Sequence, residues 1–320
     1  MNILFRADSS STIGTGHIMR DLVLAEQFKD DKIIFATQEL PGNINYKIKE
    51  KNYRLKILAS NDSNELIKLI ENYSIDMLVI DHYNIDYNYE KSLREVTGVK
   101  IFVLDDTYEK HDCDILLNHN ISANEVKYIG LVPENCEIRC GAKNILLRDE
   151  FKIIKKIRHD ISVRQTLTVF IAMGGADHSN KNIDILKVIN KFGNINANVV
   201  TTRANVNLKE LEAFTREYKN ITVHINTDKI ASLMNESDFA IVTPSVTVNE
   251  VLFMGLPFIA IQTADNQNEI ANYLKDNNFQ LLYSYDENIL AQAIKMVTDA
   301  NNYRKTLENI DAVLKRELNK

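Results

Sequence analysis

The sequence of 320 residues lacks several features that would place it in familiar classes of protein. Its net charge is −6, so it has no basic excess of the kind that nucleic-acid surfaces show. No stretch reaches the roughly 18 apolar residues of a membrane span, and Met1 is not followed by a basic segment and a long apolar run. We therefore expect a cytoplasmic protein that binds neither nucleic acid nor a membrane.

Cysteine is scarce, because the chain contains only Cys113, Cys136 and Cys140. An odd number in a chain of this size indicates reduced thiols and not a disulfide framework. Cys136 and Cys140 could ligate a metal ion, but no second pair of Cys or His residues with the spacing of a zinc site accompanies them. We expect no metal site at these positions.

Apolar runs that are typical of buried strands alternate with helical patterns along the chain. The chain is longer than one comfortable core, and its 45% hydrophobic residues can fill two domains of about 150 residues each. The alternation predicts an α/β fold with parallel sheets and crossover helices. The expected strands are residues 3–5, 33–36, 55–58, 77–80, 101–104, 167–172, 197–201, 222–225, 239–242, 257–261 and 280–283.

The boundary between the two domains is less clearly marked. Residues 118–164 have fewer clear periods and include a charged run at residues 148–159, so we interpret them as the crossing between domains. The predicted domains are residues 1–150 and residues 151–320. Two helical patterns close the chain, and the last of them, residues 303–317, could fold back on the first domain.

The most informative segment leads from an apolar strand at residues 3–5 through a polar loop into a predicted helix. Gly14 and Gly16 stand directly before His17, and glycines at such a turn let a ligand approach the backbone. Free amides at a helix start attract anions, and histidine commonly acts as a general base near neutral pH. His17 is therefore a candidate catalytic base, although the same motif suits a histidine that only caps or packs.

Other polar residues follow predicted strands of the first domain. Asp8 could orient the imidazole, bind a sugar group or form an Asx turn. Asp81, His82 and Tyr83 end another strand and could line the same cleft, where Tyr83 could stack or donate a hydrogen bond. Arg148 could reach a diphosphate or sugar, or be solvated within its charged run.

The neighbouring pair Asp105 and Asp106 resembles a metal-binding pair. Its position after the strand at residues 101–104 suits loop capping equally well. No other residues support a divalent ion, so we expect none.

The second domain has a glycine turn of its own, because Gly174 and Gly175 follow a predicted strand and precede a helix. Such a turn can seat a diphosphate, though many α/β domains use Gly-Gly without binding phosphate. Glu250, in the second turn of a later helix, can accept hydrogen bonds from two ribose hydroxyls, or be a surface glutamate. Asn266 and Gln267 can donate to phosphate or sugar oxygens, or simply cap a helix.

These segments together resemble the UDP-sugar hydrolases of pseudaminic acid biosynthesis, which act on UDP-2,4-diacetamido-2,4,6-trideoxy-β-L-altropyranose. The resemblance covers nearly the whole chain. It rests on FRADSSSTIGTGHIMRDLVLAEQF near the start, VIDHY from Val79, CDILLN from Cys113, GLVPENCEIRCG from Gly130, LLRDEF from Leu146, IAMGGADHSN from Ile171 and SVTVNE from Ser245. The Gly-Gly and Glu elements also resemble the wider group of glycosyltransferases with the GT-B fold.

The resemblance implies a GT-B fold, with two Rossmann-like domains, an interdomain cleft, uridine held by the second domain and the sugar facing the first. It implies hydrolysis of the anomeric C–O bond with inversion, to UDP and the free diacetamido sugar. It makes His17 the catalytic base. The expected substrate contacts are Asp8, Gly14, Gly16, Asp81, His82, Tyr83 and Arg148, and the expected UDP contacts are Gly174, Gly175, Ser245, Val246, Asn249, Glu250, Asn266 and Gln267.

Neither a cofactor nor a metal ion is expected, because GT-B enzymes generally use helix dipoles where other enzymes use a divalent ion. The UDP-sugar is the expected partner, and a monomer is the expected state. One alternative is a GT-B glycosyltransferase, which passes the sugar to an acceptor instead of water. Another is a Rossmann oxidoreductase or a nucleotide-sugar-binding module, but the dinucleotide fingerprint lacks its third glycine after His17.

Overall fold

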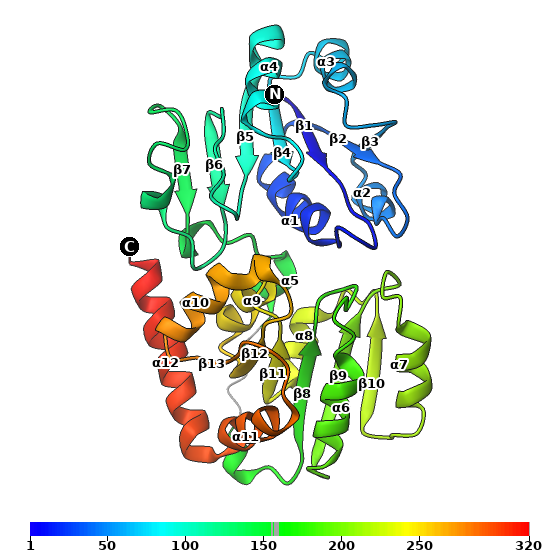
Figure 1. The fold of residues 1–320 in the computed structure, drawn as a ribbon, viewed down its shortest axis with the longest axis vertical. Coiled ribbons are helices and arrows are strands. Elements are labelled where there is room, and N and C mark those ends of the chain that lie inside the picture. The colour runs from blue at the N-terminus through cyan, green and yellow to red at the C-terminus, as the bar shows by residue number, and fades with distance from the viewer. Residues whose placement is uncertain (155, 157–159, 320) are drawn as a thin grey trace. The chain divides into compact units, whose positions relative to one another are not determined.

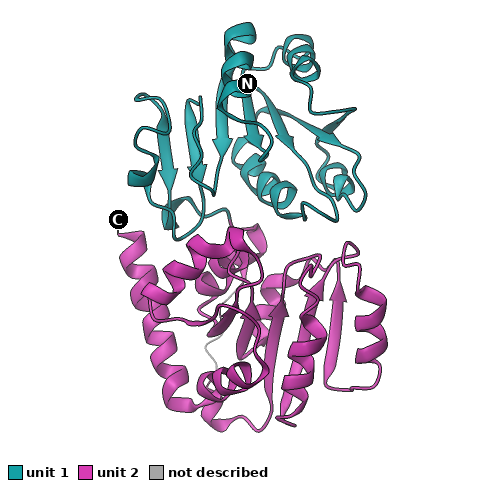
Figure 2. Ribbon diagram, viewed as in Figure 1, with its two compact units in different colours: residues 1–146 teal, residues 147–320 magenta. Residues whose placement is uncertain are grey.

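The computed structural model describes residues 1–154, 156 and 160–319. The chain divides into two compact units, Met1–Leu146 (unit 1) and Leu147–Lys320 (unit 2), shown in Figure 2. Each unit contains one parallel sheet with helices packed against it (Figure 1). Among the described residues, no helix combines the length and apolar character needed to cross a membrane.

Unit 1 is built on a seven-stranded sheet in the order β3-β2-β1-β4-β5-β6-β7, and every neighbouring pair is parallel. The strands are β1 (Asn2–Ala7), β2 (Lys32–Gln38), β3 (Arg54–Leu58), β4 (Met77–Asp81), β5 (Lys100–Leu104), β6 (Ile115–Asn118) and β7 (Glu137–Cys140). The α-helices are α1 (Gly16–Ala25), α2 (Asn45–Glu50), α3 (Ser63–Asn72) and α4 (Tyr87–Thr97). Short 3-10 turns are η1 (Glu26–Phe28), η2 (Glu125–Tyr128) and η3 (Ala142–Asn144).

Both faces of this sheet are apolar, as expected for a parallel sheet covered by helices on each side. On β1, Ile3 and Phe5 join a core cluster with Ile18 of α1. Leu4 points to the opposite face and joins a cluster that includes Leu66 of α3. The alternation of side chains along a strand thus assigns α1 and α3 to opposite faces.

The order of the strands creates a switch point in the middle of the sheet. β1 lies between β2 and β4, and Ala7 at the end of β1 is in register with Asp81 at the end of β4. Open α/β sheets hold ligands at the carboxyl ends of the strands flanking such a point. α1, and with it His17, begins after the loop that follows β1.

Unit 2 repeats this architecture with a six-stranded parallel sheet in the order β10-β9-β8-β11-β12-β13. The strands are β8 (Leu167–Ala172), β9 (Ile195–Thr201), β10 (Ile221–Ile225), β11 (Phe239–Val242), β12 (Phe258–Ile261) and β13 (Gln280–Leu282). The helices are α5 (Asp149–Ile153), η4 (Ile161–Val163), α6 (Asn182–Asn190), α7 (Leu208–Thr215), α8 (Ile230–Glu236), α9 (Val246–Met254), η5 (Asp265–Gln267), α10 (Asn268–Asp276), α11 (Glu287–Thr298) and α12 (Ala300–Leu318). The terminal helix α12 packs against α9 and α11 within unit 2.

The expected strands all appear, but the interpretation of residues 118–164 as a crossing between domains is wrong for their first part. Residues 118–146 belong to unit 1, which gains β7 from them, and β6 ends at residue 118. β7 is a half-exposed edge strand of four residues, so it lacks the apolar run that marks buried strands. Within the charged run at residues 148–159, residues 155 and 157–159 lie outside the described part of the chain.

His111 forms a second buried ionic cluster with Glu90 and Asp105. Its Nδ1 lies 2.7 Å from Oε1 of Glu90, which is fully buried, and its Nε2 lies 3.7 Å from Asp105. Burial alone would lower the pKa of His111, but the carboxylates of Asp105 and Glu90 outweigh it and raise that pKa to about 9. The imidazolium is therefore part of the folded structure at neutral pH.

This cluster predicts that the protein loses stability in mild alkali. Because the folded pKa of His111 exceeds its ordinary value of 6.5, its contribution is complete below pH 6.5 and disappears as the pH rises through about 9. We expect a loss of the order of 3 kcal/mol across this window. Urea unfolding at successive pH values measures it, and the His111→Gln variant serves as the control. An equally steep loss in that variant would contradict the assignment.

Candidate functional site

His17 lies in the first turn of α1, and its nearest charged partner is the last residue of β4. Nδ1 of His17 lies 2.7 Å from Oδ1 of Asp81. The carboxylate is almost fully buried, and His17 is only 7% exposed. A carboxylate on Nδ1 fixes both the orientation and the tautomer of an imidazole, which leaves Nε2 free to accept a proton.

Arg20 holds Asp81 from the same helix. Its Nε donates to Oδ2 of Asp81 at 2.6 Å and its Nη2 donates to Oδ1, which makes a bidentate pair. Burial alone would raise the pKa of Asp81, but the charges of Arg20 and His17 outweigh it and hold that pKa well below its usual range. Asp81 is therefore an ionised acceptor for the Nδ1–H group of His17.

Tyr83 and Asp106 complete the surroundings of His17 in unit 1. The Tyr83 hydroxyl donates to Oδ1 of Asp106 at 3.0 Å, and Nη1 of Arg20 donates to Oδ2 of Asp106 at 2.9 Å. The Tyr83 ring meets the His17 ring edge to face, with centroids 4.9 Å apart. Burial and the charge of Asp106 raise the pKa of Tyr83, so its hydroxyl stays a donor at neutral pH.

Of the roles considered for Asp8, orienting His17 is not the one that the structure shows, because Asp8 has other partners. Its Oδ2 accepts from Arg6 at 2.8 Å and lies 3.1 Å from Nε2 of His82, while its Oδ1 accepts from the Gln38 amide. Burial raises the pKa of Asp8, but the hydrogen bonds of His82 and Arg6 outweigh it and lower that pKa far below its usual range. Asp8 is thus committed to bonds within the protein, and Asp81 takes the orienting position.

Gly14 lies in the loop before α1, and Gly16 is the first residue of that helix. Gly14 has a φ of +88°, which closes the turn in which Ser10 and Gly14 exchange backbone hydrogen bonds. Among the described residues, nothing lies within 4 Å of where a Cβ of Gly14 or Gly16 would stand. The N-cap residue of α1, Thr15, makes no side-chain capping bond, so no cap from this residue occupies the amides at the helix start.

Two residues of the cluster around His17, Arg20 and Asp106, were not predicted from the sequence as site residues. Arg20 stands three residues after His17, and residues at that spacing share one face of a helix, so the spacing was a usable signal. Asp106 follows β5, the strand next to β4, and was considered only as part of a metal-binding pair. Neither residue could be linked to Asp81 until the order of the strands was known.

Asp105 and Asp106 diverge and do not act as a pair. Asp105 accepts from the Thr107 and Tyr108 amides and from the Tyr128 hydroxyl, and these and other contacts lower its pKa to about 2 against the effect of burial. This is the loop-capping role. The described residues contain no group of three or more His, Cys, Asp or Glu side chains that could hold a metal ion.

In unit 2, the predicted UDP contacts lie after β8, β11 and β12, which are consecutive in the sheet. Gly174 turns with a φ of +82°, and the Gly175 carbonyl accepts from the Thr202 amide at 2.9 Å. The following helix, α6, begins only at Asn182, and Asp177 accepts from the first amides there. The Gly-Gly loop is therefore separated from the helix start that was expected to seat a diphosphate.

The start of α9 offers a different helix terminus. Ser245 is its N-cap residue, but the Ser245 side chain makes no bond to the helix and contacts Thr243 instead. No acidic residue stands in the first turn. Uncapped amides together with the helix dipole favour an anion at this position. Val246, an expected UDP contact, is the first residue of this helix, and Asn249, another, is buried within it.

Glu250 of α9 lies next to Arg148, which belongs to unit 2. Nη2 of Arg148 donates to Oε1 of Glu250 at 2.8 Å, and Nη1 of Arg148 lies 3.0 Å from Glu150. The structure thus groups Arg148 with a predicted UDP contact. After β12, the Gln267 side chain closes its own loop by bonding the Thr263 amide and hydroxyl, whereas Asn266 is exposed.

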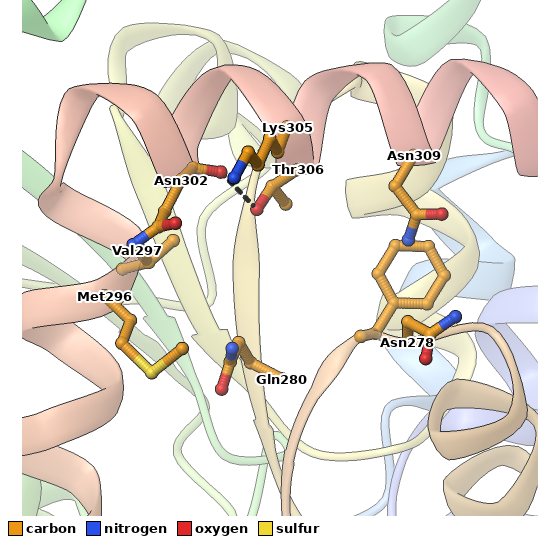
Figure 3. A pocket seen from close by; sticks show the side chains of 9 residues that line it. Asn278, Gln280, Met296, Val297, Asn302, Lys305, Thr306 and Asn309 are labelled. Atoms are coloured by element: carbon orange, nitrogen blue, oxygen red, sulfur yellow. Dashed lines mark hydrogen bonds between the residues drawn. The ribbon is translucent and has the colours of Figure 1, made fainter.

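A pocket of about 260 Å³ opens elsewhere in unit 2, between β13, α11 and α12 (Figure 3). Its lining is mostly amide and apolar, with Lys305 as the charged member, and Thr306 donates to the Asn302 carbonyl at 2.9 Å. It contains no carboxylate, no imidazole and none of the predicted site residues. The pocket therefore carries none of the side chains on which the predicted chemistry depends.

Comparisons with known proteins identify relatives of this chain. The UDP-2,4-diacetamido-2,4,6-trideoxy-beta-L-altropyranose hydrolase of Campylobacter jejuni is 41% identical over 285 residues, which are 89% of this chain and 100% of that protein. No protein-family model matches the chain.

Solved structures show the fold at much lower identity. The spinosyn rhamnosyltransferase SpnG matches with a TM-score of 0.67 and 12% identity over 100% of both chains. Anabaena HepE in complex with UDP and glucose matches with a TM-score of 0.65 and 11% identity, over 99% of this chain and 95% of that one. The chain, with its two Rossmann-like units, therefore has a GT-B fold. By its identity to the Campylobacter protein over that protein's full length, the chain belongs to the family of UDP-2,4-diacetamido-2,4,6-trideoxy-beta-L-altropyranose hydrolases.

Proposed function

We propose that the protein hydrolyses UDP-2,4-diacetamido-2,4,6-trideoxy-β-L-altropyranose to UDP and the free sugar, with His17 as general base. Family membership supports the substrate, because the Campylobacter relative carries this activity in its name. The observation that carries the mechanism is the 2.7 Å contact between Nδ1 of His17 and Asp81. It leaves Nε2 as the basic atom at the carboxyl edge of the sheet.

The chemistry needs only a base and a stabilised leaving group. Nε2 of His17 takes a proton from water, the water oxygen bonds to the anomeric carbon, and the bond from that carbon to the β-phosphate oxygen breaks. Attack from the face opposite UDP inverts the configuration, as in inverting glycosidases. Asp81 stabilises the imidazolium that forms, and Tyr83 borders the same ring.

UDP leaves as an anion, and the N-terminus of a helix stabilises negative charge. We therefore assign the diphosphate of UDP to the start of α9. The uncapped amides and the dipole of this helix stabilise the growing negative charge. Glu250, one turn further along, is assigned to the ribose hydroxyls, and Gly174, Gly175, Asn249, Asn266 and Gln267 stay predicted UDP contacts. Asp8, Gly14, Gly16, His82 and Arg148 stay predicted substrate contacts. A cytoplasmic location fits the three free thiols.

The test of this function is direct. The protein is incubated with the UDP-sugar without any acceptor, UDP release is followed enzymatically, and the anomer formed first is read by proton NMR. We expect stoichiometric UDP and the inverted free sugar. Release of UDP only after an acceptor is added identifies a glycosyltransferase, and binding without turnover identifies a nucleotide-sugar-binding module.

The assignment of Glu250 predicts a defect in nucleotide binding. A hydrogen bond to a charged group contributes about 1.5–3 kcal/mol, so Glu250→Gln should weaken UDP binding roughly 10- to 100-fold while kcat changes little. The wild-type protein should prefer UDP over 2′-deoxy-UDP, and the variant should lose this preference. Isothermal titration of both ligands measures the coupling between the side chain and the hydroxyl.

The matched control is Glu150→Gln, because Glu150 is the other carboxylate that contacts Arg148. If Glu250 acts only by holding Arg148, the two variants should weaken UDP binding alike and both should keep the preference for UDP. That result would remove Glu250 from the ribose site.

A further inference from the structure

Asp21 is a fully buried carboxyl group that has no ordinary partner. It follows Arg20 on α1 and is 0% exposed. Within the described chain, no hydrogen-bond donor reaches either of its carboxyl oxygens. Asp8 after β1 and Asp81 at the end of β4 are also buried, but each accepts several hydrogen bonds. A buried carboxylate keeps its charge only when it is paired or hydrogen-bonded, so Asp21 is not built to be ionised.

The charged groups that act on Asp21 are Asp81 at the end of β4 and Arg20 on its own helix. Asp81 is an ionised carboxylate within hydrogen-bonding reach, so it repels a second negative charge and attracts a proton. Arg20 attracts a negative charge, but its nitrogens already donate to Asp81 and Asp106. Burial first, and then the charge of Asp81, raise the pKa of Asp21 well above its usual range.

We propose that Asp21 is held as a neutral carboxylic acid that donates its proton to Asp81, and that it is thereby a positioning residue for His17. Asp81 then receives three donors, His17, Arg20 and Asp21, which fix its plane against the imidazole. With Asp21 neutral, the charges of Asp81 and Asp106 are balanced by Arg20 together with the proton that His17 takes from water. The catalytic part of this inference rests on the proposed function, whereas the protonation of Asp21 does not.

The protonation is tested by the difference in melting temperature between the Asp21→Asn variant and the wild-type protein across pH. A raised folded pKa means that the unfolded chain releases the proton of Asp21 above its ordinary value of 3.8 while the folded protein keeps it. The wild-type protein therefore loses stability as the pH rises from there, and the Asn variant, which has no such proton, does not. We expect the melting temperature of the variant, relative to the wild-type value, to increase as the pH rises.

Asp105→Asn is the control, because the pKa of Asp105 is lowered to about 2. Its variant should lose stability relative to the wild-type protein as the pH rises from about 2 to 4 and then run parallel to it up to about pH 6.5, above which His111, which faces Asp105, begins to titrate. A falling or constant difference for Asp21→Asn above pH 4 shows an ionised Asp21 and overturns the proposal, whether or not the enzyme is active.

The positioning role is tested by comparing Asp21→Asn with Asp21→Leu. Asparagine is neutral and keeps a donor, so UDP release should stay within about threefold of wild type, whereas leucine removes the donor and should lower kcat roughly tenfold with KM unchanged. Equal losses in both variants, or no loss in the leucine variant, would overturn the positioning role. If the leucine variant does not fold, an asparagine variant with a large loss of kcat overturns it and one near wild type supports it. Failure of the wild-type protein to release UDP counts against the proposed function alone.

Discussion

Replacing His17 with alanine is expected to lower the rate of UDP release by roughly 10²- to 10⁴-fold, the usual contribution of a general base. The affinity for UDP should stay near the wild-type value, because the residues assigned to UDP lie in unit 2. Single-turnover kinetics measures the first quantity and isothermal titration the second. Because the variant leaves the pair of Arg20 and Asp81 intact, added imidazole should restore part of the activity.

The control for this variant is His224→Ala. His224 lies on β10 and contacts Asn198 at 3.1 Å, so its loss tests the removal of an imidazole that has no role in the reaction. Its turnover should match the wild-type value. A His17→Ala protein that turns over substrate normally but binds UDP poorly would show that His17 contacts the nucleotide and is not the base.

Asp81→Asn is expected to lower turnover almost as much, by roughly 10²- to 10⁴-fold, although the side chain keeps its shape. The carboxylate accepts from Nδ1 of His17, and an amide group that turns its nitrogen to the imidazole stabilises the opposite tautomer, in which Nε2 carries the proton. The variant also loses the charge that stabilises the imidazolium. Titration of His17 by NMR should show the changed tautomer.

Glu90→Gln is the matched control for Asp81→Asn. Glu90 also lies 2.7 Å from Nδ1 of a buried histidine, but that histidine is His111 and not the proposed base. Both variants neutralise a buried carboxylate and should destabilise the protein by about 1–3 kcal/mol. Only Asp81→Asn should lower kcat. Equal kcat values in the two variants would mean that Asp81 acts through stability alone.

The strands of this protein differ in how easily they are recognised from the sequence. Strands such as β1 and β8 are apolar runs next to glycine turns, and such runs are local signals. β7 pairs at the edge of the sheet through a half-exposed segment, so its assignment depends on the neighbouring β6 and not on its own residues. The same limit placed residues 118–146 in the crossing between domains, although the structure assigns them to unit 1.

The candidate site also combines residues that local sequence signals mark with residues that only the fold brings together. His17 stands in a strand–loop–helix segment that is continuous in the chain, so its residue types and spacing marked it as a base and linked it to a family of hydrolases. Its partners depend on the sheet order β1-β4-β5, which brings Asp81 to within a hydrogen bond of Arg20 across 61 residues and Asp106 across 86. Sequence patterns report local propensity and periodicity, whereas contacts between strand ends arise only when the sheet has formed. The proposal that His17 is the base was therefore determined by the sequence, and the groups that surround its imidazole were decided by the tertiary structure.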